Sequence, residues 1–317
     1  MERRKVGGSE LEVVPLALGG NVFGWTIDEA ASFRVLDGFV AAGLNFIDTA
    51  DVYSRWAPGN RGGESETILG KWFKASGKRD QVVLATKVGM DMGDGKVGLS
   101  KSYILRAAED SLRRLQTDRI DLYQTHKDQD PETPQQETLE AYDQLIKEGK
   151  VRVIGASNFT AERLAEALKI AADTGLPRYQ CLQPHYNLVE RADFEAELGP
   201  FCLKENIGVI PYYSLASGFL TGKYRREDDL SKSPARSTNV KKYLNDRGFR
   251  VLDALDQVAS GLKAKPASVA LAWLLARPGV TAPIAGANSV EQLDDLVQAL
   301  SIKLDAEAMK LLDDASA

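Results

Sequence analysis

The amino-acid sequence predicts a (β/α)8 barrel, in which eight parallel strands are enclosed by helices. Short apolar runs recur along the 317 residues, and a longer amphipathic segment follows most of them. Their spacing is fairly even, and no shift in composition marks a second domain. A doubly wound open sheet is the alternative architecture with the same alternation. We favour the closed barrel and expect residues 1–317 to form one domain.

The eight apolar runs are rich in β-branched and aromatic residues and are too short for helices, which is typical of buried parallel strands. In order they are Pro15–Leu18, Asn45–Thr49, Val82–Val88, Ile120–His126, Val151–Ser157, Gln180–His185, Ile207–Tyr212 and Ala282–Gly286.

The segments between these runs have the periodicity of helices with one apolar face. Asp28 can cap a helix in which Phe33, Leu36 and Val40 share a face, and Gly43 ends it. Two further helices begin after Ser100 and Thr160. Their expected buried stripes are Ile104, Ala108, Leu112 and Leu115 in the first, and Leu164, Ala167, Leu168 and Ala171 in the second.

Two segments lie outside this alternation. Arg3–Val6 and Leu11–Val13, around Gly7 and Gly8, indicate a β-hairpin that could plug the bottom of the barrel. Ser217–Asn245 is a long polar insertion after the seventh strand, and we interpret it as a binding lid rather than a solvated loop. Its basic residues are Lys223, Arg225, Arg226, Lys232, Arg236, Lys241 and Lys242.

The bulk composition narrows the function classes. A net charge of −5 makes nucleic acid a poor partner. No run approaches the length of a membrane span. Cys181 and Cys202 have no metal-ligand spacing and suggest buried free thiols in a reducing compartment. We therefore expect a cytoplasmic protein without a metal site, acting on a small molecule, with a monomer as the default assembly.

In such a barrel, the carboxyl ends of the strands converge on one site. Lys87 ends an apolar strand and needs a charge partner, and Asp48 on the neighbouring strand is the natural one. His126 ends the next strand, and Tyr53 follows Asp48 by five residues. We expect these four side chains to meet at the barrel mouth.

These residue types suit the reduction of a carbonyl group. Hydride addition builds negative charge on the carbonyl oxygen, which then needs a proton and hydrogen-bond donors. Tyr53 would give the proton, and the cation of Lys87 would lower the pKa of the phenol. Asp48 would hold Lys87, and neutral His126 would orient the carbonyl. A Schiff-base lyase using Lys87 is an alternative, although such a lysine must be neutral.

At these residues the sequence resembles the aldo-keto reductase superfamily over essentially the whole chain. The matching segments are Gly43–Ala50 with Tyr53, Leu84–Lys87, Asp121–His126, Ile154–Asn158, Gln183–Asn187 and Gly218–Tyr224. The resemblance implies the (β/α)8 barrel, a catalytic set of Asp48, Tyr53, Lys87 and His126, and NADPH bound without a Rossmann fold. A cofactor-loaded regulatory subunit of an ion channel, as in some relatives, is a second alternative function.

The resemblance also implies a cofactor site. Ser157, Asn158 and Gln183 would hold the nicotinamide amide, and Tyr212 would stack on its ring. Tyr213, Leu215, Ser217 and Lys223 would approach the pyrophosphate. The segment near the adenine ribose corresponds to Gly286–Gln292, with Gly286, Asn288 and Gln292 as candidate contacts. His185, just past Gln183, is interpreted as structural.

The sequence departs from the family pattern near the ribose. Many relatives carry a lysine or arginine just after the glycine, where this chain has Ala287, Asn288 and Ser289. A basic residue of the Ser217–Asn245 insertion could supply the missing charge. We therefore expect NADPH as the cofactor and leave NADH open.

Three aromatic residues lie in loops expected at the barrel mouth, namely Phe23, Trp25 and Trp56. They predict an apolar pocket for an aldehyde, ketone or sugar-like carbonyl. Aromatic residues packed only against each other are the alternative interpretation.

Overall fold

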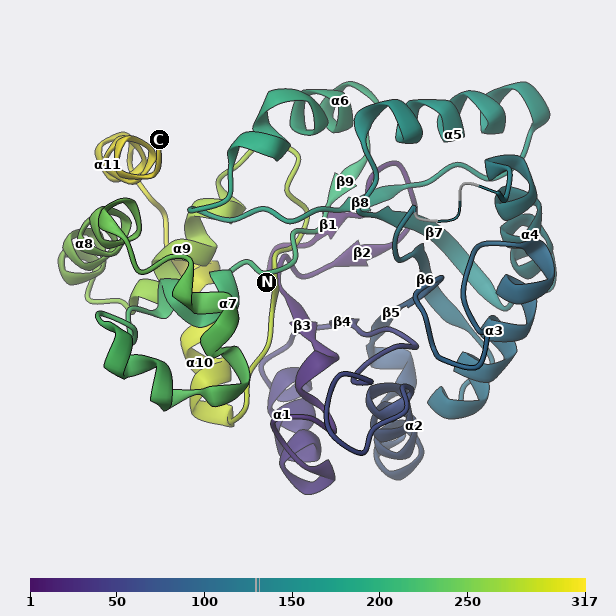
Figure 1. The fold of residues 1–317 in the computed structure, drawn as a ribbon, viewed down its shortest axis with the longest axis horizontal. Helices are drawn as coiled ribbons and strands as arrows, with labels where there is room; N and C mark the ends of the chain where they lie inside the picture. Colours follow the sequence, from purple (N-terminus) through teal and green to yellow (C-terminus); the bar gives the residue numbers. More distant parts are fainter. Residues whose placement is uncertain (129, 131) are drawn as a thin grey trace.

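The computed structural model describes residues 1–128, 130 and 132–317 and contains the predicted parallel sheet (Figure 1). Within these residues, eight strands are hydrogen-bonded in the order β10-β3-β4-β5-β6-β7-β8-β9. They are β3 (Ala17–Gly19), β4 (Phe46–Asp48), β5 (Val83–Val88), β6 (Ile120–Thr125), β7 (Val151–Ser157), β8 (Cys181–Gln183), β9 (Gly208–Val209) and β10 (Ile284–Ala285). Each lies within or overlaps its predicted run.

The two end strands of this sheet meet and close it. Val209 of β9 forms a parallel bridge with Val280, just before β10. The amide of Thr281 donates to the carbonyl of Val209 at 2.7 Å, and the amide of Ile284 donates to the carbonyl of Pro211 at 2.9 Å. The sheet is therefore a barrel, which confirms the predicted (β/α)8 fold class over the open-sheet alternative.

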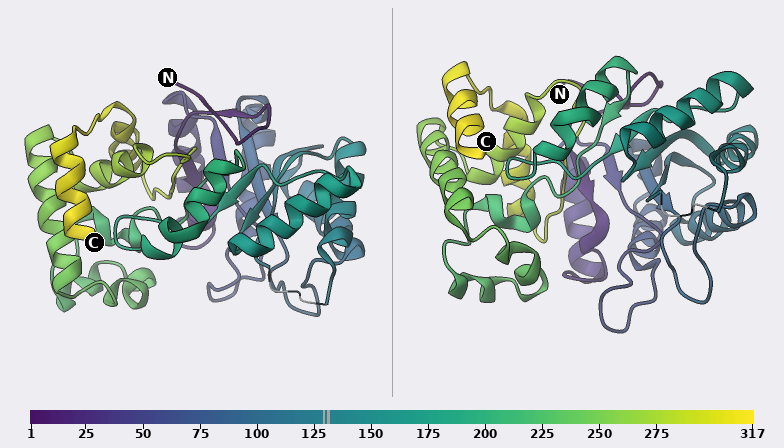
Figure 2. Two further views of the ribbon diagram at one scale, coloured as in Figure 1. Left: turned by 90° about the horizontal axis from the view of Figure 1, so that it is seen from above. Right: turned by 45° about the horizontal axis from the view of Figure 1, so that its top comes forward.

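Helices surround the strands, as Figures 1 and 2 show. Those that follow the first six barrel strands are α1 (Glu29–Ala41), α2 (Glu64–Ser76), α3 (Lys101–Leu115), α4 (Gln135–Lys147), α5 (Ala161–Thr174) and α6 (Gly199–Lys204). The C-terminal third adds α8 (Asp246–Leu262), α9 (Pro266–Leu275), α10 (Val290–Gln298) and α11 (Ala306–Ser316). Helix α11 lies beside α8 on the outside of the barrel.

The predicted helix starts are largely confirmed. The side chain of Asp28 accepts from the amide of Ala31 at 2.8 Å and caps α1. Thr160 caps α5 in the same way, whereas Ser100 precedes α3 without a side-chain cap. The predicted stripe of α3 is buried completely.

The buried face of α1 differs from the predicted one. Its buried residues are Ser32, Val35, Leu36 and Phe39, while Phe33 and Val40 are only partly covered. In α5, Leu168 is likewise only partly covered. Residues three or four apart share a face, so several overlapping stripes satisfy one periodicity. Which of these stripes is buried depends on the strands and helices that pack against the helix.

The N-terminal hairpin is also confirmed. Strands β1 (Arg4–Lys5) and β2 (Glu12–Val13) pair antiparallel. The hairpin residues Val6, Leu11 and Val13 are buried in one apolar cluster with inward-facing residues of the barrel strands. These strand residues include Phe46, Ala85, Leu122, Val153, Cys181 and Ile210. The hairpin therefore closes the barrel at the end opposite the polar strand ends.

The insertion after β9 is not a structureless loop. It folds into the short helices η4 (Ala216–Thr221), η5 (Glu227–Lys232), η6 (Pro234–Arg236) and α7 (Ser237–Lys241). The carboxylate of Asp229 accepts from the amides of Arg225 and Arg226 at 2.8 and 3.1 Å, which fixes the start of η5. Because such single turns are too short for a clear period, the sequence pattern does not show them.

Candidate active site

A buried ion pair stands at the carboxyl ends of β4 and β5. The Nζ atom of Lys87 lies 2.7 Å from Oδ2 of Asp48 and donates to the carbonyl oxygen of Thr49 at 2.7 Å. The side chain of Lys87 is 0% exposed. Burial disfavours this cation, but the charge of Asp48 and the hydrogen bonds outweigh burial, so the pKa of Lys87 is raised. The predicted pairing is confirmed.

The second carboxylate oxygen of Asp48 is held by two amides. Nε2 of Gln124 donates to Oδ1 at 3.1 Å, and Nε2 of Gln183 donates to the same atom at 2.9 Å. Sequence reasoning gave Gln124 no role. The sequence feature that could have indicated a role is that Gln124 is a polar residue on an apolar strand, and this strand is the neighbour of the strand that carries Lys87. These two donors fix Asp48 so that its other oxygen points at Lys87.

Tyr53 lies where its hydroxyl meets this ion pair. Its phenol oxygen is 3.2 Å from Nζ of Lys87, and the ammonium also lies 4.8 Å from the ring centroid. Burial raises the pKa of Tyr53 above its usual value, and Lys87 offsets this only in part. Lys87 lowers the pKa of the phenol, as predicted, but desolvation of the phenolate outweighs this attraction, so Tyr53 is less acidic than a free tyrosine.

His126 follows β6 and faces the same phenol. The rings of Tyr53 and His126 are 5.9 Å apart between centroids, in an edge-to-face arrangement. Burial and, secondarily, the charge of Lys87 hold the pKa of His126 well below its usual value. Its buried Nδ1 atom has no hydrogen-bond partner among the described residues. The imidazole is therefore neutral, as predicted.

The residues expected to hold a nicotinamide amide also lie together. Oγ of Ser157 donates to the carbonyl of Gln183 at 2.9 Å, and Nδ2 of Asn158 donates to the carbonyl of His126 at 2.9 Å. The hydroxyl of Tyr212 donates to Oδ1 of Asn158 at 2.8 Å. Ser157, Asn158, Gln183 and Tyr212 thus form one connected group beside His126.

The residues expected near the pyrophosphate lie on the segment that leaves β9. Tyr213 is 41% exposed, and both Tyr213 and Ser217 adopt left-handed backbone conformations. Leu215 is half-buried at the start of η4. Lys223 lies with its Nζ atom 4.9 Å from the ring centroid of Tyr224 and forms no ion pair within the described residues. A free cation thus follows this tight turn.

The segment expected near the ribose begins α10. The amide of Asn288 donates to Oε1 of Gln292 at 2.9 Å, and Oδ1 of Asn288 accepts from the hydroxyl of Thr26 at 2.9 Å. A Cβ atom on Gly286 would lie 3.4 Å from the carbonyl oxygen of Gly19, so only a small residue fits there without adjustment. Asn288 and Gln292 are thus ordered by each other, and the segment itself carries no cation.

Aromatic side chains line the mouth above Tyr53. Trp56 contacts the ring of Tyr53 and that of Trp25, each at a centroid distance of 5.5 Å. The guanidinium of Arg236, from the insertion, lies 4.6 Å from the ring centroid of Trp25. Phe23 is 0% exposed and packs in the main core. The prediction that Phe23 lines the pocket wall is therefore wrong. The loop that carries it turns this side chain inward.

The comparisons with known proteins agree with this geometry. The model of the aldo/keto reductase family matches residues 15–317. The chain belongs to the aldo/keto reductase family. It is therefore an NAD(P)H-dependent oxidoreductase.

This aldo/keto reductase is similar to several curated proteins over most of its length. It is 39% identical to the uncharacterized oxidoreductase YrpG of Bacillus subtilis, covering 99% of this chain and 95% of that protein. It is 35% identical to the aldo-keto reductase YhdN of the same organism, covering 93% and 86%. A probable voltage-gated potassium channel subunit beta of Oryza sativa is 32% identical, covering 95% and 92%.

The side chains fit the nicotinamide cofactor of an aldo/keto reductase. Oε1 of Gln183 accepts no hydrogen bond within the described part of the chain, although Nε2 of the same amide is engaged. A carboxamide could use this oxygen together with the side chain of Asn158.

Among the helices of the described residues, none has both the length and the apolar character that a membrane span requires.

Proposed function

We propose that this protein reduces an aldehyde or ketone to an alcohol with NADPH and that Tyr53 donates the proton. The observation that supports this most directly is the contact of the Tyr53 hydroxyl with the buried ammonium of Lys87, 3.2 Å away. The neutral imidazole of His126 on the adjoining strand end adds a second polar group. A proton donor, a charge stabiliser and a hydrogen-bond donor are the groups that carbonyl reduction needs.

Each of the four catalytic side chains has a separate proposed role. The nicotinamide supplies a hydride to the carbonyl carbon when it is bound. Tyr53 gives its phenolic proton to the carbonyl oxygen, and Lys87 stabilises the phenolate that is left. Asp48, held by Gln124 and Gln183, keeps Lys87 charged and in place. His126 hydrogen-bonds the carbonyl oxygen and orients it.

The raised pKa of Tyr53 favours the reductive direction. Burial keeps the phenol protonated at neutral pH, so Tyr53 still carries its proton when the hydride is transferred. Lys87 then limits the cost of the phenolate during transfer, since the two groups are in contact. The buried tyrosine therefore acts as an acid that loses its proton only when the carbonyl oxygen becomes basic.

The preference for NADPH rests on cations of the insertion. Arg236 is half-buried on Trp25, and it makes no ion pair with a carboxylate of the described residues. Lys223 is also unpaired within them. A half-buried cation without an anionic partner, such as Arg236, is suited to a phosphate group, whereas Lys223 is exposed. Arg236 would replace the basic residue that the Gly286–Gln292 segment lacks, while Lys223 would serve the pyrophosphate.

Two alternative functions have less support. A Schiff-base lyase needs a neutral lysine, and the contact with Asp48 raises the pKa of Lys87. A purely regulatory role is suggested only by the similarity to a probable potassium channel subunit. The complete set of Asp48, Tyr53, Lys87 and His126 favours catalysis.

The test is to add a panel of aldehydes and ketones to the purified protein with NADPH and to follow loss of the reduced nicotinamide by absorbance. We expect carbonyl-dependent oxidation with at least one compound and formation of the matching alcohol. Binding of NADPH with no turnover on any compound would favour the regulatory role.

A further inference from the structure

Three aromatic rings pack together behind the nicotinamide site. The rings of His185 and Tyr212 are stacked with an interplanar angle of 14° and centroids 5.3 Å apart. Tyr213 meets Tyr212 at 5.2 Å and His185 at 5.5 Å, both edge-to-face. The amide of Tyr212 donates to the carbonyl of Pro184 at 2.9 Å, which ties the two strand ends together. The orientation of Tyr212 is thus set by His185 and Tyr213.

The ring of His185 covers one of the two faces of Tyr212. The hydroxyl of Tyr212 donates to Asn158, and Tyr212 interacts electrostatically with Tyr53. His185 instead interacts with charges outside the barrel mouth, namely Glu190, Lys242 and Asp193. Because His185 already covers one face, a nicotinamide ring that stacks on Tyr212 would take the opposite face, with Tyr212 between the two rings.

A neighbouring amide faces one ring nitrogen of His185 and favours the neutral form. Oδ1 of Asn187 accepts from the amides of Val189 and Glu190 at 2.9 and 3.0 Å, which sets the orientation of this side chain. Nδ2 of Asn187 therefore points to Nε2 of His185, at 3.5 Å, and to the carbonyl of Tyr213, at 3.0 Å. An amide N–H facing Nε2 suits a neutral imidazole and opposes a proton on that nitrogen.

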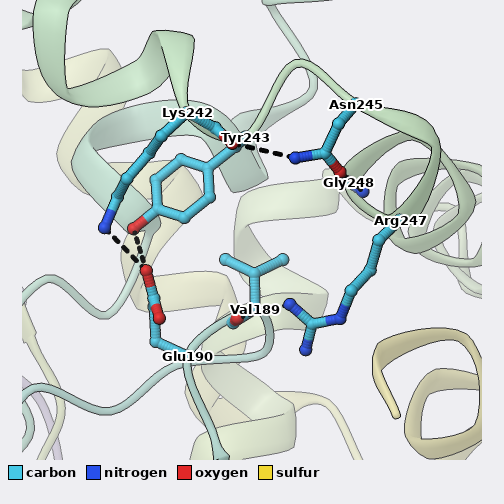
Figure 3. Close-up of a pocket in the computed structure, with 7 residues that line it drawn as sticks. All are labelled: Val189, Glu190, Lys242, Tyr243, Asn245, Arg247 and Gly248. Carbon is cyan, nitrogen blue, oxygen red and sulfur yellow. Dashed lines mark hydrogen bonds and ion pairs between the residues drawn. The ribbon is translucent and has the colours of Figure 1, made fainter.

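The nearest charges beyond His185 already neutralise each other. Oε1 of Glu190 accepts from Nζ of Lys242 at 2.7 Å and from the hydroxyl of Tyr243 at 3.0 Å, as Figure 3 shows. These groups line a cavity of about 140 Å³. Burial, aided by Lys242 and opposed by Glu190 and Asp193, lowers the pKa of His185. The imidazole thus stays neutral near pH 7 and can gain a charge in acid.

We propose that His185 is a positioning residue, which braces the cofactor-facing ring of Tyr212 and makes the affinity for oxidised cofactor depend on pH. This inference rests on the proposed function, because it takes Tyr212 as the platform for the nicotinamide. An oxidised nicotinamide ring carries a positive charge that the reduced ring lacks. A proton on His185, one aromatic ring away, repels only the oxidised form.

The experiment measures dissociation constants of NADP⁺, NADPH and adenosine 2′,5′-bisphosphate, which has no nicotinamide, between about pH 5 and about pH 7.5. The proteins are the unmodified chain, His185→Phe, which keeps a flat ring without a titrating group, and His185→Ala, which removes the ring. Calorimetry gives the affinities, and thermal melting followed by circular dichroism checks that each variant is folded.

We expect acidification of the unmodified chain to weaken NADP⁺ roughly fivefold more than NADPH. In His185→Phe the ratio of the two constants should not change with pH. His185→Ala should weaken both dinucleotides severalfold and leave the fragment unchanged. A pH-independent ratio in the unmodified chain, or an equal loss for the fragment in His185→Ala, overturns the inference while leaving the proposed function intact. Failure of the unmodified chain to bind either dinucleotide overturns both.

Discussion

The ammonium nitrogen of Lys87 lies 3.2 Å from the phenol oxygen of Tyr53, and the ammonium is held in place by two further contacts. Asp48 and the carbonyl of Thr49 hold the ammonium, each at 2.7 Å. A fully buried cation is thus aimed at one hydroxyl by backbone and side-chain contacts from the neighbouring strand. Such preorganisation is effective in catalysis because the charge does not have to be reoriented during the reaction.

Replacement of Tyr53 by Phe should reduce turnover by about 10²–10⁴-fold, because it removes the proposed general acid. The ring and its contacts with Trp56 and His126 are retained, so the affinity for NADPH should remain nearly unchanged. Steady-state rates with a reducible carbonyl and a separate NADPH titration test both parts. Undiminished turnover in this variant would refute the role of Tyr53.

The pKa directions predict the pH dependence of reduction. Tyr53 must be protonated to act, and its pKa is raised, so activity is retained at neutral pH and is lost only as the pH rises through this raised value. His126 must be neutral, and its pKa is lowered well below about 6.5, so no loss is expected near that pH. Profiles of kcat/KM against pH check this. A decline centred between about pH 7 and about pH 9, the range of an acidified phenol, would contradict it.

The buried pair makes a prediction about stability. Lys87→Met leaves the carboxylate of Asp48 buried without its cation and should cost about 3–5 kcal/mol of unfolding free energy. Adding Asp48→Asn removes that charge while keeping an oxygen for the amides of Gln124 and Gln183, so the double variant should regain part of the loss. Urea denaturation of the three proteins measures this. A double variant less stable than Lys87→Met would exclude the account given for the pair.

Arg236 supplies a test of cofactor preference. Arg236→Gln should weaken NADPH about tenfold and NADH little, because one charged contact to a phosphate is lost. The matched control is Arg226→Gln, on an exposed cation of the same insertion. Tryptophan fluorescence titrations report both affinities, and Trp25 under Arg236 makes the signal sensitive to this site. Equal losses for NADPH and NADH would argue against recognition of the additional phosphate.

Trp56 tests the pocket at the mouth. Trp56→Ala should raise KM for bulky carbonyl compounds by about five- to tenfold, because it removes a wall beside Tyr53 and Trp25. Since Trp56 is 47% exposed, the melting temperature should change little. NADPH affinity serves as the control. Unaltered KM values for large and small carbonyls alike would show that substrates do not contact this ring.

Much of the site could be predicted from the sequence because its parts stand at strand ends. The apolar runs located those ends, and the barrel topology brings polar residues such as Asp48, Lys87 and His126 to one mouth. The ion pair of Asp48 and Lys87 followed from the need of a buried lysine for a partner. The role of Gln124 was not predicted, because an amide on an apolar strand has several possible partners.

By itself, the sequence determined the order of strands and helices, the hairpin, and which polar residues meet at the barrel mouth. These features follow from local periodicity and from the position of each residue relative to a strand end. Only the tertiary structure decided that burial keeps Tyr53 a weak acid, that Phe23 turns into the core, and that His185 stacks behind Tyr212. Solvation and ring contacts depend on neighbours that are distant in the chain, and no local pattern encodes them.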